Sequence, residues 1–251
     1  MPRLTRSRLA GLPGNGAPPR SRCSRGVVHG LLAAGFHLAT AVQHGTAQDS
    51  VRAMEAAAER YREVGAMCAD FEQAIEVRLA RRTIESAGRV CQQRPNLFSM
   101  RFTDPDGDMV VSDGEFFWVY YPSIDDAQVN RHPVSDAPGS QDFFRELLED
   151  PGVKYDAEES GIEAVGGHDC QVVALTPRAG AAYDRARLWL DTESHVIRRL
   201  EIHEPSGNVR TVTLHGLDLS PAIDPGTFVF EVPEGARIRG GLRRGGPSVL
   251  R

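Results

Sequence analysis

Apolar and polar residues alternate along much of the chain, and this pattern predicts an antiparallel β-sheet. The clearest strand begins at Met67 and ends at Leu79, with acidic residues such as Asp70, Glu72 and Glu76 on its polar side. Successive side chains of a strand point to opposite faces, so a period of two over a dozen residues indicates a half-buried strand. The apolar side consists of Met67, Ala69, Phe71, Ile75, Val77 and Leu79.

A second strand at residues 83–93, after a turn at residues 80–82, completes a predicted hairpin. Similar runs continue to residue 217, and turn formers such as Asp113 with Gly114 and Gly166 with Gly167 separate them. A last short strand is predicted at residues 228–230. The total is about eleven antiparallel strands, and a sheet of that size curls or closes.

Two segments have helical rather than alternating periodicity. In the first, Asp49 or Ser50 caps a helix that ends at Gly65, and its apolar face is Val51, Met54, Ala58, Tyr61 and Val64. The second spans about ten residues from a Ser140 cap to the stop at residues 151–152, with an apolar face of Phe143, Phe144, Leu147 and Leu148. A helix this short is marginal alone, so it must cover an apolar surface. Helices on the concave face of a curled sheet would line a cavity.

The first 47 residues differ from the rest of the chain. They hold six arginines and no acidic residue, then an apolar run at residues 26–42 and small residues at 39–41 and 45–47. This order is that of a secretory signal peptide, cleaved after Ala41 or Ala47. The alternative is a disordered leader on a cytosolic protein. We predict one domain at residues 48–238 and a disordered Gly- and Arg-rich tail at residues 239–251.

Charge argues against a nucleic-acid partner. Six of the 29 basic residues lie in the leader, which leaves 23 against 34 acidic residues and a net charge of −11. A polyanion binder needs the opposite sign.

The cysteines predict one disulfide. If the first hairpin folds about Leu79 and Ala80, residues whose numbers sum to 159 face each other, and Cys68 with Cys91 is such a pair. Two buried thiols are the alternative. Cys23 lies in the leader, and Cys170 is left over.

No enzyme-like constellation stands out, so we expect no catalytic residue, metal or cofactor. Three aspartates at 104, 106 and 108 imitate a calcium loop, but Met109 stands where that loop needs glycine. His168, Asp169 and Cys170 are adjacent in a strand, where neighbours point to opposite faces. The remaining histidines of the strands, His195, His203 and His215, are scattered singly.

The strongest candidate site is an apolar surface with an arginine at its edge. The surface residues are Phe98, Met100, Phe102, Trp118 and Tyr120, which ordinary core packing would also explain. The five N–H donors of Arg94 need partners, and the end of the short helix at residues 140–150 offers free carbonyls. We predict that Arg94 bonds this helix as a latch, with Phe143, Phe144 and Leu147 facing the surface. A surface arginine with a hydrated head is the alternative.

Several blocks resemble the periplasmic outer-membrane lipoprotein carrier family (LolA-like). They are residues 94–98 (RPNLF), 110–114 (VVSDG), 118–122 (WVYYP), 69–73 (ADFEQ) and 228–235 (FVFEVPEG), and the resemblance covers about 50–238. It implies an unclosed β-barrel with a helical lid over an apolar cavity, with Arg94 bonded to the lid and Phe98 at the cavity mouth. The cysteines, the basic tail and the weakly matching second helix depart from the family's pattern.

The resemblance also implies a function and partners. Such carriers take acylated lipoproteins from an inner-membrane ABC-type releasing complex (LolCDE-like) and pass them to an outer-membrane receptor (LolB-like). A tail of about 15 methylenes costs on the order of 10 kcal/mol to hold in water, so a carrier must cover it. We therefore expect a monomeric periplasmic carrier. The alternatives are a carrier of glycolipid or another free lipid, a lipoprotein-sensing regulatory protein and, least favoured, a hydrolase of acylated substrates.

Overall fold

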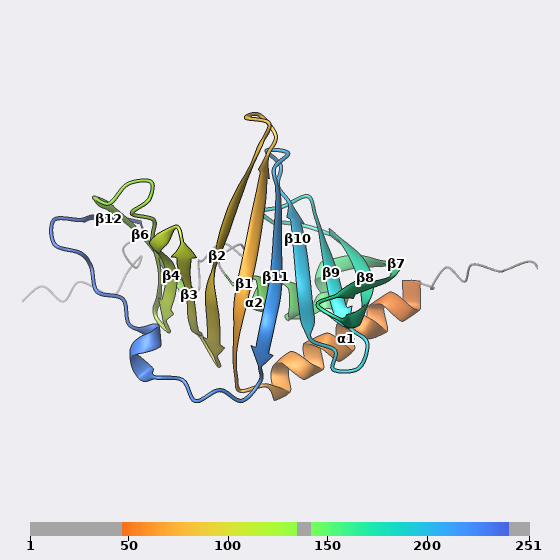
Figure 1. Ribbon diagram of the computed structural model, residues 1–251. Helices are drawn as coiled ribbons and strands as arrows, with labels where there is room; N and C mark the ends of the chain where they lie inside the picture. Colours follow the sequence, from red (N-terminus) through yellow and green to blue (C-terminus); the bar gives the residue numbers. More distant parts are fainter. Residues whose placement is uncertain (1–46, 135–141, 241–251) are drawn as a thin grey trace, which may run out of the picture. The chain divides into compact units, whose positions relative to one another are not determined.

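The described part of the structure is one long, mostly antiparallel sheet with helices packed on it. The structure is a computed structural model that describes residues 47–134 and 142–240 (Figure 1). Within these residues the helices are α1 (Ala47–Glu63), α2 (Phe143–Leu148), α3 (Pro151–Lys154) and the 3₁₀ helix η2 (Pro225–Phe228). None of them is both long enough and apolar enough to cross a membrane.

The described residues form twelve strands, close to the number that the sequence predicts. The strands are β1 (Ala66–Val77), β2 (Arg82–Gln93), β3 (Leu97–Asp104), β4 (Asp106–Asp113), β5 (Phe116–Tyr120), β6 (Gln128–Pro133), β7 (Tyr155–Val165), β8 (His168–Pro177), β9 (Arg185–Asp191), β10 (Ile197–His203), β11 (Val209–Asp218) and β12 (Arg237–Arg239).

The sheet does not close on itself. Its strand order is β12-β6-β5-β4-β3-β2-β1-β11-β10-β9-β8-β7, so β12 and β7 are the edges. The pairing of β1 with β11 near the middle, with Phe71 opposite Leu214, joins the two halves of the chain. All pairs are antiparallel except that of β12 with β6. The prediction of a mainly β, unclosed antiparallel sheet is confirmed.

The first hairpin has the predicted register. Every pair along it sums to 159, from Ala66 opposite Gln93 to Val77 opposite Arg82. Cys68 and Cys91 face each other with their Cα atoms 4.1 Å apart and form a disulfide. The predicted bridge is therefore present, and Cys170 is a buried free cysteine.

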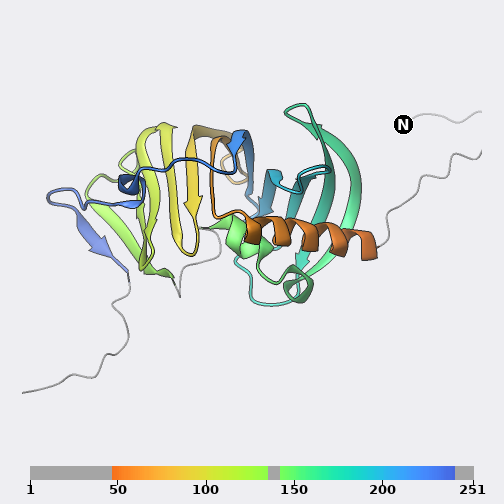
Figure 2. The same ribbon diagram turned by 90° about the horizontal axis from the view of Figure 1, so that it is seen from below.

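The main core lies between one face of the sheet and the helices. It combines Met54 and Ala58 of α1 and Leu147 of α2 with Phe71 and Phe98 of the strands. Figure 2 shows α1 and α2 on the same side of the sheet. Because a short helix cannot bury an apolar face alone, packing on the sheet rather than helix propensity keeps α2 folded.

The opposite, outer face carries the disulfide and the C-terminal segment. Phe228 is buried against Cys68 and Cys91. The prediction of a strand at residues 228–230 is wrong, because Phe228 is the last residue of the helix η2 and the next two residues belong to no strand. The last strand, β12, comes later, at Arg237–Arg239. It pairs with β6 and includes Arg239, the first residue of the predicted tail. Residues 241–251 of that tail lie outside the described part.

The predicted signal peptide also lies outside the described residues, apart from Ala47, at which α1 begins. The chain separates into two units at residue 41, and everything described here belongs to the second.

Candidate functional site

Helix α2 is a six-residue helix that packs on the concave side of the sheet. Its four apolar residues, Phe143, Phe144, Leu147 and Leu148, are all buried. Its N-cap is Asp142, whose side chain accepts a hydrogen bond from the backbone N–H of Arg145 at 3.1 Å. The predicted cap, Ser140, lies outside the described residues, and the helix is shorter than predicted. An aspartate directly before an apolar run was the sequence signal for this start.

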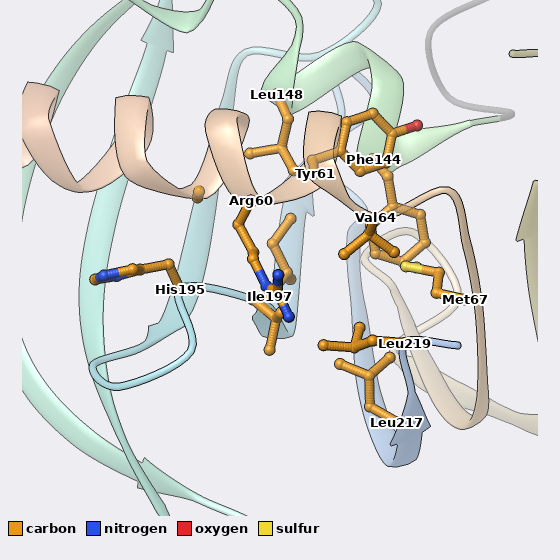
Figure 3. A pocket seen from close by; sticks show the side chains of 12 residues that line it. Arg60, Tyr61, Val64, Met67, Phe144, Leu148, His195, Ile197, Leu217 and Leu219 are labelled. Carbon is orange, nitrogen blue, oxygen red and sulfur yellow. The ribbon is translucent and has the colours of Figure 1, made fainter. Parts of the chain in front are cut away.

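Two pockets lie on either side of α2. The inner pocket lies against Phe144 and Leu148, and its volume is about 20 Å³. Figure 3 shows its lining gathered from α1, α2 and the neighbouring strands and turns, with the nitrogen-bearing side chains of Arg60 and His195 among them. It is lined by Ala57, Arg60, Tyr61, Val64, Met67, Phe144, Leu148, His195, Val196, Ile197, Leu217 and Leu219.

The rim pocket lies against the other apolar pair of α2, Phe143 and Leu147. Its volume is about 260 Å³, and the turn between β10 and β11 forms its opposite wall. Its other lining residues are Glu146, Ala182, Tyr183, Ile202, Glu204, Pro205, Ser206 and Arg210.

The space on the concave side is therefore narrow while α2 is seated. The inner pocket has room for about one water molecule, whereas pockets for small ligands measure roughly 300–1,000 Å³. Both pockets are lined by side chains of α2, Phe144 and Leu148 in the inner pocket and Phe143 and Leu147 in the rim pocket.

A buried polar cluster fastens the start of α2. Gln92 of β2 donates from Nε2 to Oδ2 of Asp142 at 3.1 Å, and the same amide lies within hydrogen-bond reach of the Tyr61 hydroxyl of α1. We call Tyr61, Gln92 and Asp142 the polar latch. It connects one strand and two helices through the buried side chains of Gln92 and Asp142 and the half-buried side chain of Tyr61.

Further contacts hold the body of α2. The guanidinium of Arg145 reaches Asn96 Oδ1 at 3.5 Å and the carbonyl of Val134 at 3.3 Å. At the far end, the Tyr155 hydroxyl donates to the carbonyl oxygen of Glu146 at 2.9 Å. Net hydrogen-bond contributions are about 1 kcal/mol each, so these contacts position the helix without making it immovable.

Burial governs the ionisation of the latch. It raises the pKa of Asp142 to about 6, although the backbone N–H and the charge of Arg145 lower it. Burial, and then the neighbouring carboxylate of Asp142, also raise the pKa of Tyr61 well above its ordinary value. The latch thus holds a neutral phenol and a carboxyl group whose pKa is close to neutrality.

Arg94 does not bond the helix. Its side chain is exposed and lies 5.6 Å from the ring centre of Tyr61, and its backbone N–H bonds the Gly65 carbonyl. Among the described residues it makes no hydrogen bond to α2 or α3. The contact that the sequence predicts between Arg94 and the helix is not among the bonds of the described residues, where Gln92 and Asn96, on either side of it, bond Asp142 and Arg145.

The sequence itself indicates that Gln92 is buried. Cys91 faces the outer side in its disulfide, so its neighbour Gln92 must face the core. A buried amide requires partners.

The predicted apolar surface is divided between the two faces of the sheet. Phe98, Met100 and Phe102 share one face and are buried in the main core. Trp118 and Tyr120 are not on that face, because Phe117 and Val119 occupy it. Trp118 stacks instead on Phe230 of the C-terminal segment, with ring centres 5.3 Å apart. The placement of Trp118 and Tyr120 on the same surface as Phe98 is wrong.

The histidines and the free cysteine that the sequence singled out lie in the strands and turns from β8 to β11. No group of three or more His, Cys, Asp or Glu within residues 47–134 and 142–240 is arranged to hold a metal ion. His168 pairs with Asp191 at 3.1 Å, and burial raises the pKa of the nearby Cys170 thiol.

Comparison with known proteins identifies the family. The family model described as outer membrane lipoprotein carrier protein LolA matches residues 62–231. The chain belongs to the LolA family. The matched region includes Gln92 and Asp142 of the polar latch and all of α2, and it begins one residue after Tyr61.

Individual relatives agree with this family assignment. The chain is 30% identical over 190 residues to an outer-membrane lipoprotein carrier protein of Alkalilimnicola ehrlichii, covering 76% of this chain and 83% of that protein. It is 34% identical over 157 residues to a carrier protein of the same description from Halorhodospira halophila, covering 61% and 69%.

Proposed function

We propose that this LolA-family protein is a periplasmic carrier that binds the acyl chains of lipoproteins between its sheet and helix α2. The observation that carries the proposal is the position of α2, a six-residue helix that separates two pockets on the concave apolar face. Family membership supplies the class of cargo. The carrier would take acylated lipoproteins from a LolCDE-like complex in the inner membrane and pass them to a LolB-like receptor in the outer membrane.

The apolar residues of α2 act as a substitute for cargo in the empty carrier. Phe144 and Leu147 keep the concave face out of water while no acyl chain is bound. When chains enter, they take the place of these side chains on the concave face, so the face stays covered in both states. A carrier of this kind can load and unload without a nucleotide of its own.

The polar latch makes the exchange reversible. Opening must break the bond between Gln92 and Asp142 and the contacts of Arg145, each worth about 1 kcal/mol or somewhat more where a charge takes part. That sum is small compared with the free energy gained by sequestering one acyl chain from water, which is on the order of 10 kcal/mol. The latch therefore closes the empty carrier but cannot keep cargo out.

The test is to identify what the protein carries. The full chain is expressed in a Gram-negative host, purified from the periplasm and analysed by mass spectrometry of its bound lipids. We expect peptides bearing a triacylated N-terminal cysteine. Free glycolipid alone would favour a free-lipid carrier, and no bound lipid would contradict the proposal.

A matched pair of variants places the cargo. Val64→Glu puts a carboxylate into the inner pocket, and we expect it to lower the amount of bound lipid at least fivefold. Leu79→Glu adds the same charge at a side chain that is 93% exposed, and it should leave bound lipid unchanged. Equal binding by both variants would place the acyl chains elsewhere.

A further inference from the structure

The rim pocket has charged lining residues that binding of acyl chains alone would not require. Phe143 and Leu147 of α2 form its apolar wall, and Arg210, Glu204 and Glu146 contribute charged groups on other sides. With about 260 Å³, it is more than ten times larger than the inner pocket. Its mixture of apolar and charged lining suits the boundary between a lipid tail and a polar head.

Arg210 is held in place at this boundary. Its Nη1 donates to Oε1 of the buried Gln73 at 3.1 Å, and the Gln73 amide in turn donates to Ser86. Its guanidinium carbon lies 6.0 Å from the ring centre of Phe143, the first residue of α2. A guanidinium has five N–H donors, and these contacts leave donors over for a ligand. Arg210 is therefore a fixed donor directly beside the helix that must move.

The charges of the pocket oppose an anionic ligand. Glu204 Oε1 lies 3.7 Å from Arg210 Nη2, and the side chain of Glu146 also lines the pocket. Lys154 approaches Glu146 at 3.9 Å but is not part of the lining. Two carboxylates against one guanidinium repel a phosphate, whereas an uncharged carbonyl can accept from Arg210 without that penalty.

We infer that the rim pocket is a head-group subsite in which Arg210 binds ester and amide carbonyls of the cargo while Glu146 and Glu204 disfavour anionic phospholipid. The inference rests on the proposed function, because a molecule whose chains lie where Phe143 and Leu147 now pack brings its head out beside Arg210. The ligand class is an acylated head rich in carbonyls and free of phosphate, as in a triacylated cysteine. The subsite lets the carrier reject the phospholipids that surround such cargo in a membrane.

The test compares two ligands on the full chain after lipid removal. A synthetic triacylated-cysteine lipopeptide and phosphatidylglycerol each compete with a fluorescent fatty-acid probe. We expect wild type to favour the lipopeptide at least tenfold. Arg210→Gln should weaken lipopeptide binding about tenfold, and Arg210→Lys should recover part of it. Glu204→Gln, which keeps an acceptor for Ser206, should strengthen phosphatidylglycerol binding at least threefold and so narrow the preference for the lipopeptide.

Controls separate the subsite from folding and from the function itself. Arg89→Gln alters an exposed arginine paired with Asp70 and should change neither affinity. Lipopeptide binding that Arg210→Gln leaves intact, or a ligand preference that Glu204→Gln does not shift, would overturn the subsite. If Arg210→Gln fails to fold, the Glu204→Gln comparison still decides. Wild type that binds neither ligand would contradict the proposed carrier function instead.

Discussion

Gln92 on β2 and Asp142 at the start of α2 share a hydrogen bond of 3.1 Å although fifty residues separate them in the chain. Both side chains are buried, and Tyr61 of α1 completes the cluster. Buried polar groups are costly unless they are paired. This pair therefore favours one position of α2 over others, which apolar packing alone specifies weakly.

The first prediction concerns Asp142→Ala. The change removes both the N-cap of α2 and the acceptor of Gln92, and loss of an N-cap costs about 1 kcal/mol. We expect the amides of α2 to exchange with solvent deuterium at least fivefold faster, measured by mass spectrometry. Asp224→Ala removes the equivalent cap of η2 on the outer face and should leave α2 unchanged. Unaltered exchange in Asp142→Ala would mean that the latch does not hold the helix.

The second prediction concerns pH. Burial raises the pKa of Asp142 from an ordinary 3.8 to about 6, so the folded state holds this proton more tightly than the unfolded state. Its contribution to stability is complete below about pH 4 and is lost as the pH rises through about 6. The full effect is on the order of 3 kcal/mol.

Asp142→Asn isolates this contribution from that of other groups. Burial tends to raise the pKa of Asp191, but hydrogen bonds from neighbouring backbone N–H groups and from Arg198 lower it to about 2. Its contribution to stability therefore changes with pH in the opposite direction, and it is the same in both proteins. We expect the unfolding free energy of wild type, relative to Asp142→Asn, to fall between pH 4 and pH 7. A constant difference in urea titrations across this range would contradict the raised pKa.

The third prediction compares two arginines. Arg145→Leu removes the contacts of α2 with Asn96 and Val134, and it should increase deuterium exchange in α2. Arg94→Leu removes an exposed side chain that lies over Tyr61, and its effect on α2 should stay within twofold. A larger increase in exchange for Arg94→Leu than for Arg145→Leu would mean that Arg94, rather than Arg145, holds the helix.

The fourth prediction tests whether α2 detaches as a unit. Leu147 and Leu188 of β9 are both 0% exposed. Leu188→Ala should cost about 2–5 kcal/mol in unfolding free energy. Leu147→Ala should cost less than half as much, because the loss cannot exceed the free energy that keeps α2 closed. Equal losses in urea denaturation would show α2 to be an inseparable part of the core.

The fifth prediction concerns the disulfide. Cys68 and Cys91 are 23 residues apart, and a bridge over a loop of this size contributes roughly 3 kcal/mol. Replacing both by serine should lower the unfolding free energy by about that amount, measured in urea. Reduction should add the mass of two hydrogens to the mature protein, and Cys170→Ser should leave this mass shift unchanged. A protein that gains no mass on reduction would contain no bridge.

Local periodicity was sufficient for the first hairpin. Alternation along residues 67–93 predicted the first hairpin, and its register followed from the turn, so Cys68 and Cys91 could be paired without a structure. This worked because the faces of a strand are set by neighbours two residues apart. The same rule failed at residues 116–121, because the residues on both faces are aromatic and the pattern does not show which face is buried. In the assembled sheet, Phe117 faces the core and Trp118 does not.

Only the tertiary structure decided how the helix is held. A sequence shows that Arg94 needs partners, but it does not show that Asp142 lies closer to Gln92 than to Arg94. That choice depends on where a six-residue helix comes to rest on a sheet assembled from distant segments. Periodicity determines which side of an element is apolar; the contacts that fasten α2 depend on side-chain positions fixed only after β2, α1 and α2 have packed together.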